Sequence, residues 1–323
     1  MAVLVFAEAT EEKMLSPVTA ELVAAGVGLG GPVTCALLGS GVEGLAQECV
    51  AAGAGRVVVV DDPVLADYQG DAYAPVAERI ARESGADIVL LGQTMMGRDL
   101  APRLAQRLGT AVAMDCVALS LQDGRLLAER PCYGGNARAR YTISTAPQIA
   151  TLRAKAVEPL APDPSRNGEI VKQAAGIDAS TVRTRIIERK KEKAEGVRLE
   201  DAKVVVGGGR GIGGPEGFKQ LEELATILGG AVGASRAVCD MGWYPVPTQI
   251  GLTGKVITPD LYIAVGISGA SQHMAGVSSV KNIAAINKDP DAAIFKASRF
   301  AVVGDWKEIV PPFTEKVREL RTG

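Results

Sequence analysis

A run of small and polar residues, Gly266-Ile-Ser-Gly-Ala-Ser-Gln-His273, has the composition of a ligand-binding turn. It follows a short β-rich apolar segment at 262–265, and glycine and serine at a strand end let backbone N–H groups approach a ligand closely. His273 is the only histidine of the chain, so a His-rich metal site is excluded. The run therefore predicts a cradle for a polar ligand.

A second glycine-rich stretch, Gly207-Gly-Gly-Arg-Gly-Ile-Gly-Gly214, lies between an apolar segment and a predicted helix. Its last six residues fit the pattern G-x-G-x-x-G, in which bare backbone at a helix N-terminus favours a pyrophosphate. A nicotinamide-binding unit should also carry an acidic residue about 20 residues further on. Asp240 lies further away and follows a turn, so the match is poor, although the sequence leaves nicotinamide binding open.

Polar turns flanked by glycine follow several predicted strands in the same half of the chain. Because the carboxyl ends of parallel strands share one edge of a sheet, where ligands bind, these side chains should converge. Serine hydroxyls suit phosphates, Asn and Asp suit sugar hydroxyls, and Arg suits negative charge. The pattern predicts an elongated ligand with phosphates, a ribose and a ring system. The turns contain Arg210, Ser235, Arg236, Thr253, Gly254, Ser268 to His273, Asn287 and Asp305.

The segments that position these residues divide into two α/β domains, each with a mostly parallel sheet flanked by helices. We predict an N-terminal domain over 1–190, a charged linker over 191–201 and a second, doubly wound domain over 202–323. In the first domain strands are expected at 3–6, 33–38, 57–60 and 87–91, and helices at 17–25, 42–52, 74–84 and 98–108.

From Cys116 the pattern is strand-like without helices, and Asp123-Gly124 is a strong hairpin signal. We expect an antiparallel ribbon that extends the first sheet, built from strands at 117–121, 125–130, 138–144 and 148–152, and one more exposed strand at Thr181–Glu188. In the second domain strands are expected at 202–206, 231–233, 262–265, 283–286 and 301–303, and helices at 215–228 and 312–320.

Composition excludes several classes of protein. The net charge is −2 and the longest basic block is Arg189-Lys190-Lys191, which is typical of a solvated helix end, so neither nucleic acid nor a lipid surface is expected as the main partner. Five scattered cysteines lack the spacing of a zinc site and are expected to be reduced thiols. Without a signal sequence or an apolar run of ~18 residues, a cytoplasmic protein that is not embedded in a membrane is expected.

Several longer motifs run through both halves of the chain. In the second half these are GGGRGIGG, GASRAVCDMGW, LTGK, PDLYIAVGISGASQHMAG and AAINKDPDAAIF, and in the first half GQTMMGRDLAPRLAQRL and RPCYGGN. Together they resemble the α subunit of electron transfer flavoproteins. The resemblance covers essentially the whole chain. It implies a heterodimer with a β subunit, in which the second domain of α binds one FAD and β carries an AMP.

The resemblance also implies electron donors and an acceptor. Electrons would arrive from acyl-CoA dehydrogenases of fatty acid β-oxidation, or from other dehydrogenases, and would leave to a membrane quinone oxidoreductase specific for the carrier. Such a redox carrier needs no catalytic nucleophile or acid/base pair, and none is predicted. The positions that match flavin contacts are Arg210, Ser235, Arg236, Gly251, Leu252, Thr253, Gly254, Ser268, Gly269, Ala270, Ser271, Gln272, His273, Asn287, Asp305 and Trp306.

Three of these residues are expected to tune the flavin. Arg236 would lie against the ring, His273 would donate to the C2 carbonyl and gain a proton as the flavin is reduced, and Thr253 would hydrogen-bond N5. A core histidine and an arginine in a surface salt bridge are the competing interpretations. Leu252 stands where many members of the family have glutamine, so a polar contact would be missing there.

The first domain has Glu8-Ala-Thr-Glu11 where a glycine-rich phosphate loop would stand, which predicts a docking platform for the partner subunit. Three alternatives to a simple carrier stay open at this point. They are a subunit of a flavin-based bifurcating complex that oxidises NADH at a second flavin in β, an NAD(P)-dependent dehydrogenase, and a nucleotide-binding protein without redox activity.

Overall fold

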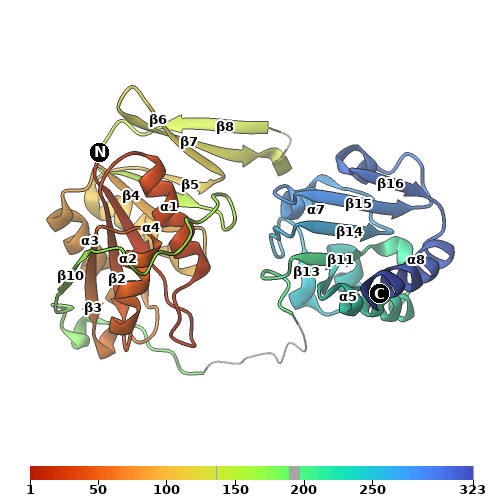
Figure 1. Cartoon of the computed structure of the whole chain (residues 1–323), viewed down its shortest axis with the longest axis horizontal. Helices are drawn as coiled ribbons and strands as arrows, with labels where there is room; N and C mark the ends of the chain where they lie inside the picture. Colours follow the sequence, from red (N-terminus) through yellow and green to blue (C-terminus); the bar gives the residue numbers. More distant parts are fainter. Residues whose placement is uncertain (136, 189–196, 323) are drawn as a thin grey trace. The chain divides into compact units, whose positions relative to one another are not determined.

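The computed structural model describes residues 1–135, 137–188 and 197–322 (Figure 1). Two compact units emerge, one containing 1–131 and 138–188 and the other 132–135, 137 and 197–322. Residues 132–135 and 137, which were expected in the first domain, thus group with the second unit. The basic triplet at 189–191 and residues 191–196 of the predicted linker lie outside the described residues.

The first unit contains a parallel sheet of seven strands in the order β10-β3-β2-β1-β4-β9-β5. Its strands are β1 Val3–Ala7, β2 Val33–Gly39, β3 Arg56–Asp61, β4 Ile88–Gly92, β5 Val112–Cys116, β9 Gln148–Leu152 and β10 Glu169–Lys172. Its helices are α1 Pro17–Gly28, α2 Ala46–Ala52, α3 Gly70–Ser84 and α4 Met95–Leu108.

Helices cover both faces of this sheet, which explains its nearly continuous apolar strands. Successive residues of a strand point to opposite faces. Val3 and Val5 of β1 therefore join the core under α1 and α2, whereas Leu4 and Phe6 join the core under α3 and α4. Two buried layers result, and the predicted α/β class is confirmed for this unit.

The predicted antiparallel ribbon is present. It does not extend the main sheet, so the expectation that it would was wrong. Strands β6 Ala118–Gln122, β7 Arg125–Cys132 and β8 Ala137–Thr142 form a separate three-stranded sheet. The hairpin signal is confirmed, since Asp123 and Gly124 both have positive φ and Gln122 pairs with Arg125. The remaining predicted ribbon strand, β9, instead lies parallel between β4 and β5.

The exposed strand expected at Thr181–Glu188 is absent from this described segment, which has only the 3-10 turn Ala179–Thr181 at its start. Arg183 of this segment contacts a helix rather than a strand, since its Nε lies 3.5 Å from Asp71 at the start of α3. The edge strand in this region is β10, four residues long, which the sequence pattern did not reveal.

The second unit contains a parallel sheet of six strands in the order β13-β12-β11-β14-β15-β16. Its strands are β11 Val204–Gly208, β12 Ala231–Ser235, β13 Gln249–Ile250, β14 Leu261–Val265, β15 Asn282–Asn287 and β16 Phe300–Val303. Its helices are α5 Phe218–Leu228, α6 Arg236–Asp240, α7 Ser271–Val277 and α8 Trp306–Thr322.

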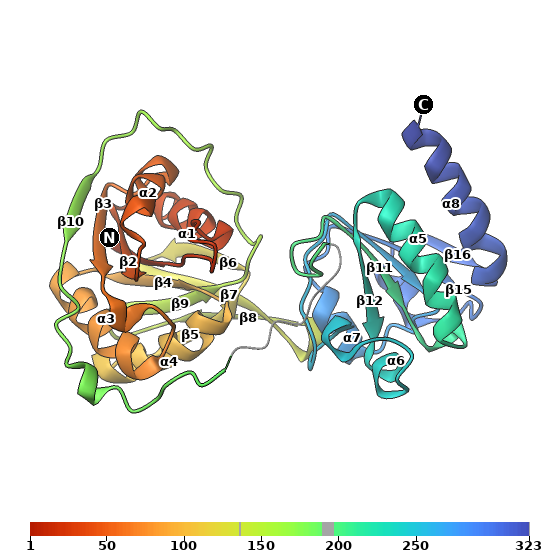
Figure 2. The same ribbon diagram turned by 90° about the horizontal axis from the view of Figure 1, so that it is seen from below.

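Helices of the second unit also lie on both faces of the sheet. Phe218 of α5 and Val310 of α8 belong to one buried cluster, and α5 and α8 pack side by side (Figure 2). Val277 of α7 belongs to the cluster on the other face. The chain order reverses at β11, because β12 follows on one side and β14 lies on the other. This doubly wound arrangement confirms the predicted fold and places a topological switch point at the carboxyl ends of β11 and β14.

Candidate functional site

The two loops at the switch point are joined through their backbones. Gly209 N donates to Val265 O at 2.9 Å, and Gly211 N donates to Gly266 O at 3.0 Å. A Cβ atom at position 209 would lie 2.2 Å from the carbonyl oxygen of Gly266. The glycines of the G-x-G-x-x-G stretch therefore allow the loop after β11 to pack against the turn after β14.

This packing leaves few amides of the loop for a pyrophosphate. Besides Gly209 and Gly211, Ile212 N donates to Gly209 O at 3.0 Å and Gly213 N donates to Arg210 O at 3.1 Å. The dinucleotide fingerprint needs such amides to face the ligand. What the loop does offer is the Arg210 side chain, which is exposed and has no ion-pair partner within the described parts of the chain.

His273 lies in the first turn of α7 and is buried, with only 7% of its surface exposed. Its Nε2 lies 2.9 Å from the hydroxyl of Tyr262 on β14, whereas its buried Nδ1 has no hydrogen-bond partner among residues 1–135, 137–188 and 197–322. Burial lowers the pKa of His273 to about 4, and the backbone of Ile250 opposes that shift. The imidazole is therefore neutral at neutral pH.

A tight loop after β13 carries Thr253. Gln249 Nε2 donates to Thr253 Oγ1 at 3.0 Å, so the hydroxyl still has its own proton to donate. Leu252 N donates to Gln272 O at 2.8 Å, which ties the loop to the start of α7. Gly251 has φ 144°, and a Cβ atom there would lie 2.9 Å from Gln272 O. The Leu252 side chain is 66% exposed and contributes no polar group.

The polar side chains at the end of β12 make few hydrogen bonds within the protein. Ser235 is the N-cap residue of α6, but its hydroxyl makes no capping hydrogen bond. Arg236 is exposed and its Nε lies 3.3 Å from Asp240 Oδ2, one helical turn away. This contact is a surface salt bridge, the competing interpretation of Arg236, and such exposed pairs hold an arginine only weakly.

Three predicted residues are largely occupied by the protein itself. Asn287 Nδ2 donates to Ile267 O at 2.9 Å and its Oδ1 accepts from Asp289 N at 3.1 Å. Asp305 Oδ1 accepts from Lys307 N at 3.0 Å in the first turn of α8. Trp306 is buried in the core, where a Cβ atom on Gly217 would lie 2.9 Å from its ring. These contacts give Trp306 a packing role.

The turn after β14 presents small residues at the same edge. Ser268 is exposed, and its carbonyl oxygen accepts from Ile294 N at 3.0 Å. Gly269 has φ 85° and lies against Ile294, while Ala270 is the N-cap residue of α7. Ser271 Oγ lies 3.3 Å from Gln272 Oε1, and both side chains are exposed. The turn thus keeps the Ser268 hydroxyl accessible.

The predicted residues therefore lie along one edge of one sheet. The β11 loop bonds to the β14 turn, Asn287 bonds to that turn, Gly304 N donates to Asn287 O at 3.0 Å, and the β13 loop bonds to α7. Sequence reasoning missed Tyr262 and Gln249, the polar partners of His273 and Thr253. Tyr262 was interpreted as an ordinary strand residue, and only its pairing across the sheet reveals its contact.

The corresponding edge of the first unit is filled by its own carboxylates. Glu8, after β1, is partly buried and accepts a hydrogen bond from Thr94 Oγ1 at 2.7 Å. Its burial raises its pKa from 4.5 to about 7. Asp61, at the end of β3, accepts from the backbone N–H groups of residues 41, 42 and 43 at 2.7, 2.8 and 3.0 Å. An aspartate thus occupies the amides that a phosphate would need.

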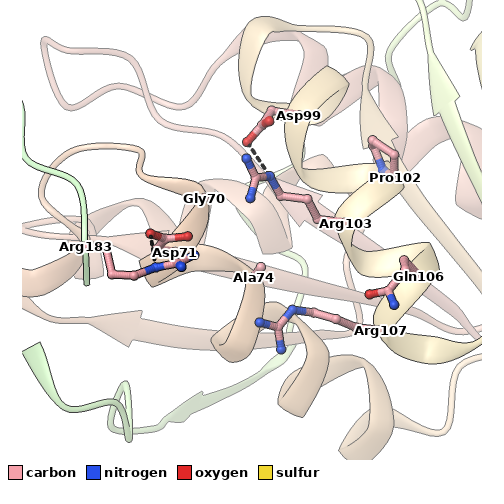
Figure 3. Close-up of a pocket in the computed structure, with 9 residues that line it drawn as sticks. All are labelled: Gly70, Asp71, Ala74, Asp99, Pro102, Arg103, Gln106, Arg107 and Arg183. Atoms are coloured by element: carbon pink, nitrogen blue, oxygen red, sulfur yellow. Dashed lines mark ion pairs between the residues drawn. The ribbon is translucent and has the colours of Figure 1, made fainter. Parts of the chain in front are cut away.

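A hollow of about 570 Å³ lies between α3 and α4 of the first unit. Figure 3 shows Arg103 and Arg107 on α4 and Arg183 arranged around the start of α3. Each arginine already has an acidic partner: Arg103 lies 3.0 Å from Asp99, Arg107 lies 2.9 Å from Glu78, and Arg183 pairs with Asp71. None of the predicted site residues lines this hollow, and its charges largely cancel.

Over the described ranges 1–135, 137–188 and 197–322, no cluster of three His, Cys, Asp or Glu residues could hold a metal ion. Within those same ranges, every helix is too short or too polar to span a bilayer.

Comparison with known proteins connects this geometry to a family. Residues 3–178 match the family model "Electron transfer flavoprotein domain", and residues 198–278 match "Electron transfer flavoprotein FAD-binding domain". The electron transfer flavoprotein subunit alpha of Bacillus subtilis strain 168 is 45% identical over 309 residues, which are 95% of this chain and 94% of that protein.

Two further relatives extend the comparison. The electron transfer flavoprotein subunit alpha of Thermoanaerobacterium thermosaccharolyticum is 44% identical, covering 90% of this chain and 88% of the relative. The protein FixB of Clostridium saccharobutylicum is 40% identical, covering 98% of this chain and 96% of the relative.

Proposed function

Because this chain belongs to the electron transfer flavoprotein family as an α subunit, we propose that its second unit binds one FAD and that it works as an electron carrier in a heterodimer with a β subunit. The observation that carries this proposal is the row of loops along the carboxyl edge of the second sheet. Most of that row lies within residues 198–278, which match the FAD-binding model.

The side chains at this edge fit an elongated anionic cofactor. Arg210 is an exposed cation with no ion-pair partner in the described part of the chain, and the Ser235 and Ser268 side chains have no capping role that would occupy their hydroxyls. The orphaned Nδ1 of His273 calls for a partner that the described residues do not supply. We therefore assign the phosphates to the serine-bearing loops and the flavin ring to the vicinity of His273.

When bound, FAD supplies the ring system that accepts and releases electrons. The protein would supply charge and hydrogen bonds around that ring. Arg236 places a permanent cation on the edge, held only by the exposed contact with Asp240. Thr253 keeps a hydroxyl proton that it could donate to N5, because Gln249 donates to its oxygen. His273 is neutral before reduction, since burial lowers its pKa, and negative charge nearby would raise that pKa again.

The proposal extends to partners and location. The first unit would be the platform for the β subunit, with AMP carried by β, because its own carboxyl edge is occupied by Glu8 and Asp61. The carrier would act in the cytoplasm, accept electrons from acyl-CoA dehydrogenases or other dehydrogenases, and deliver them to a quinone oxidoreductase at the membrane.

The geometry of the glycine-rich loop argues against an NAD(P)-dependent dehydrogenase. Its amides at 209, 211, 212 and 213 are bonded within the protein. A nicotinamide dinucleotide bound in the usual way would need some of them for its pyrophosphate.

The proposed function can be tested on the purified heterodimer. Its flavin absorbance should bleach when an acyl-CoA and a catalytic amount of acyl-CoA dehydrogenase are added. It should not bleach when NADH alone is added. Bleaching by NADH would contradict the simple carrier and favour a bifurcating complex. Flavin that neither electron source reduces would contradict acyl-CoA dehydrogenases as donors.

A further inference from the structure

The only histidine has an unusual partner. Tyr262 is completely buried on β14, and its hydroxyl lies 2.9 Å from His273 Nε2. The neighbouring strand makes room for this contact, because a Cβ atom on Gly207 of β11 would lie 2.1 Å from the Tyr262 hydroxyl oxygen. The first glycine of the glycine-rich stretch therefore serves the tyrosine–histidine pair.

A neutral imidazole carries one proton, and the pair can distribute its protons in two ways. If the proton is on Nε2, the ring donates to the Tyr262 hydroxyl. The phenol proton and the Nδ1 lone pair are then both without a hydrogen-bond partner. If the proton is on Nδ1, the phenol donates to Nε2, and only the Nδ1–H group is without a hydrogen-bond acceptor. Because unpaired buried polar groups are costly, the second arrangement is favoured.

Two further observations support the same arrangement. Burial raises the pKa of Tyr262, so the phenol keeps its proton at neutral pH. The backbone of Ile250 acts to raise the pKa of His273, as a carbonyl oxygen near a ring N–H does. No hydrogen bond of acceptable geometry reaches the buried Nδ1 from the described residues, however, so the Ile250 backbone satisfies this nitrogen at most weakly.

We propose that Tyr262 is a positioning residue that fixes His273 in the tautomer with its proton on Nδ1. The histidine is then a donor at Nδ1, and the group that satisfies it must be an acceptor, such as a carbonyl oxygen or an unprotonated ring nitrogen. Naming this acceptor as an atom of the flavin rests on the proposed function, whereas the tautomer itself does not.

The single histidine makes a direct test possible. In the full chain labelled with 15N-histidine, every imidazole signal comes from His273. We expect Nδ1 in the chemical-shift range of a protonated nitrogen and Nε2 in the range of an unprotonated one. The opposite pattern in the wild-type chain would overturn the proposal without any variant having to fold.

Substitution tests whether Tyr262 is the cause. Tyr262→Phe should move the two nitrogen shifts toward each other or exchange them, and Gly207→Ala should do the same by displacing the hydroxyl. Tyr244→Phe is the matched control, because Tyr244 is in the same unit but donates to Glu222. Wild-type shifts in a folded Tyr262→Phe chain would show that the tautomer has another origin.

Addition of FAD separates this inference from the proposed function. If FAD binds, as its absorbance reports, the Nδ1 signal should move further in the direction of a stronger donated hydrogen bond. Bound FAD that leaves Nδ1 unmoved would overturn donation to the flavin. Failure of FAD to bind would instead count against the proposed function, while the wild-type shifts would still decide the tautomer.

Discussion

Individual residues of the candidate site differ in how many of their polar groups are already hydrogen-bonded or packed within the protein. Asn287 uses both ends of its amide on backbone groups, and Trp306 is packed in the core. Ser235 and Arg210 have no such contacts within the described residues. Residue type and sequence position could suggest this set, but they could not separate ligand contacts from residues that hold the loops.

Arg236 should raise the redox potential of bound flavin, because a cation stabilises the negative charge of the reduced ring. We expect Arg236→Ala to lower the two-electron potential by roughly 30 mV, which corresponds to a tenfold change in the equilibrium constant. Spectroelectrochemical titration of the heterodimer measures this. Asp240→Asn is the control, because it frees Arg236 from its ion pair and keeps the cation. An unchanged potential in Arg236→Ala would rule out charge stabilisation by this residue.

Glu8 predicts a dependence of stability on pH. Its pKa in the folded protein is about 7, above the usual 4.5, because the carboxyl is buried. The folded state therefore binds the proton more tightly, and this stabilisation is complete below pH 4.5 and lost as the pH rises through 7. Between pH 5 and pH 8.5 the loss should be roughly 2 to 3 kcal/mol.

Glu8→Gln should remove that loss, because glutamine keeps an oxygen that can accept from Thr94 and has no proton to lose. Urea unfolding of the full chain at pH 5 and pH 8.5 measures the difference. Glu12→Gln, at an exposed position, should leave the pH dependence as it is in the wild type. If the stability of Glu8→Gln depends on pH as strongly as that of the wild type, the pH dependence comes from other groups.

Among the elements, the glycine-rich loop has the predicted secondary structure, but its glycines have a different role from the one that the motif suggests. The pattern correctly predicted a strand, a loop and a helix, with the helix core at Phe218–Leu228. The pattern suggested that glycines bring backbone close to a ligand. In the structure Gly207 faces Tyr262 and Gly209 faces Gly266, contacts with a strand more than 50 residues away in sequence that only the sheet order creates.

Gly209→Ala should destabilise the second unit by about 1 to 3 kcal/mol, because the added methyl group collides with a backbone carbonyl that cannot rotate away. Gly214→Ala, in the same loop, is the control, since nothing lies within 4 Å of a Cβ atom there. Thermal unfolding of both variants makes the comparison. Equal stability of the two would mean that the loop adjusts without cost.

In the first unit, Asp61 connects the end of β3 to the turn before α2. Burial alone would raise its pKa, but its hydrogen bonds with three backbone amides hold the pKa below the usual value. Asp61→Ala should cost about 1 kcal/mol, the typical loss when a side chain that bonds the amides at a helix start is replaced by alanine. Chemical denaturation measures it, with Glu48→Gln on α2 as a control that removes a charge without a hydrogen bond. A cost no larger than that of the control would contradict a capping role.

The sheets themselves were largely predictable, because apolar runs bounded by turns identify buried parallel strands. Three strands were missed for local reasons, among them β13, which has only two residues. In β5 burial follows no regular alternation, the register shifts before Cys116, and Asp115 has a positive φ, whereas β10 is an exposed four-residue edge strand. The alternating pattern at 181–188 resembled a strand, but Arg183 instead pairs with α3. Side-chain alternation alone cannot distinguish these cases.

For the whole molecule, both units have the same plan but differ at their carboxyl edges. In the first unit Glu8 and Asp61 fill the positions where a nucleotide would bind. In the second unit the edge keeps a cation, hydroxyl groups and one unpaired imidazole nitrogen among the described residues. This difference supports the proposal of a single cofactor site per α chain.

The cofactor content of the heterodimer tests this account most directly. The chain is co-expressed with its β subunit, the complex is purified and denatured, and the released flavin and AMP are counted by chromatography. We predict one FAD and one AMP per heterodimer, with the FAD lost from an Arg210→Ala, Ser268→Ala double variant. A heterodimer without flavin would contradict the central claim, and two FAD molecules without AMP would contradict a simple one-flavin carrier.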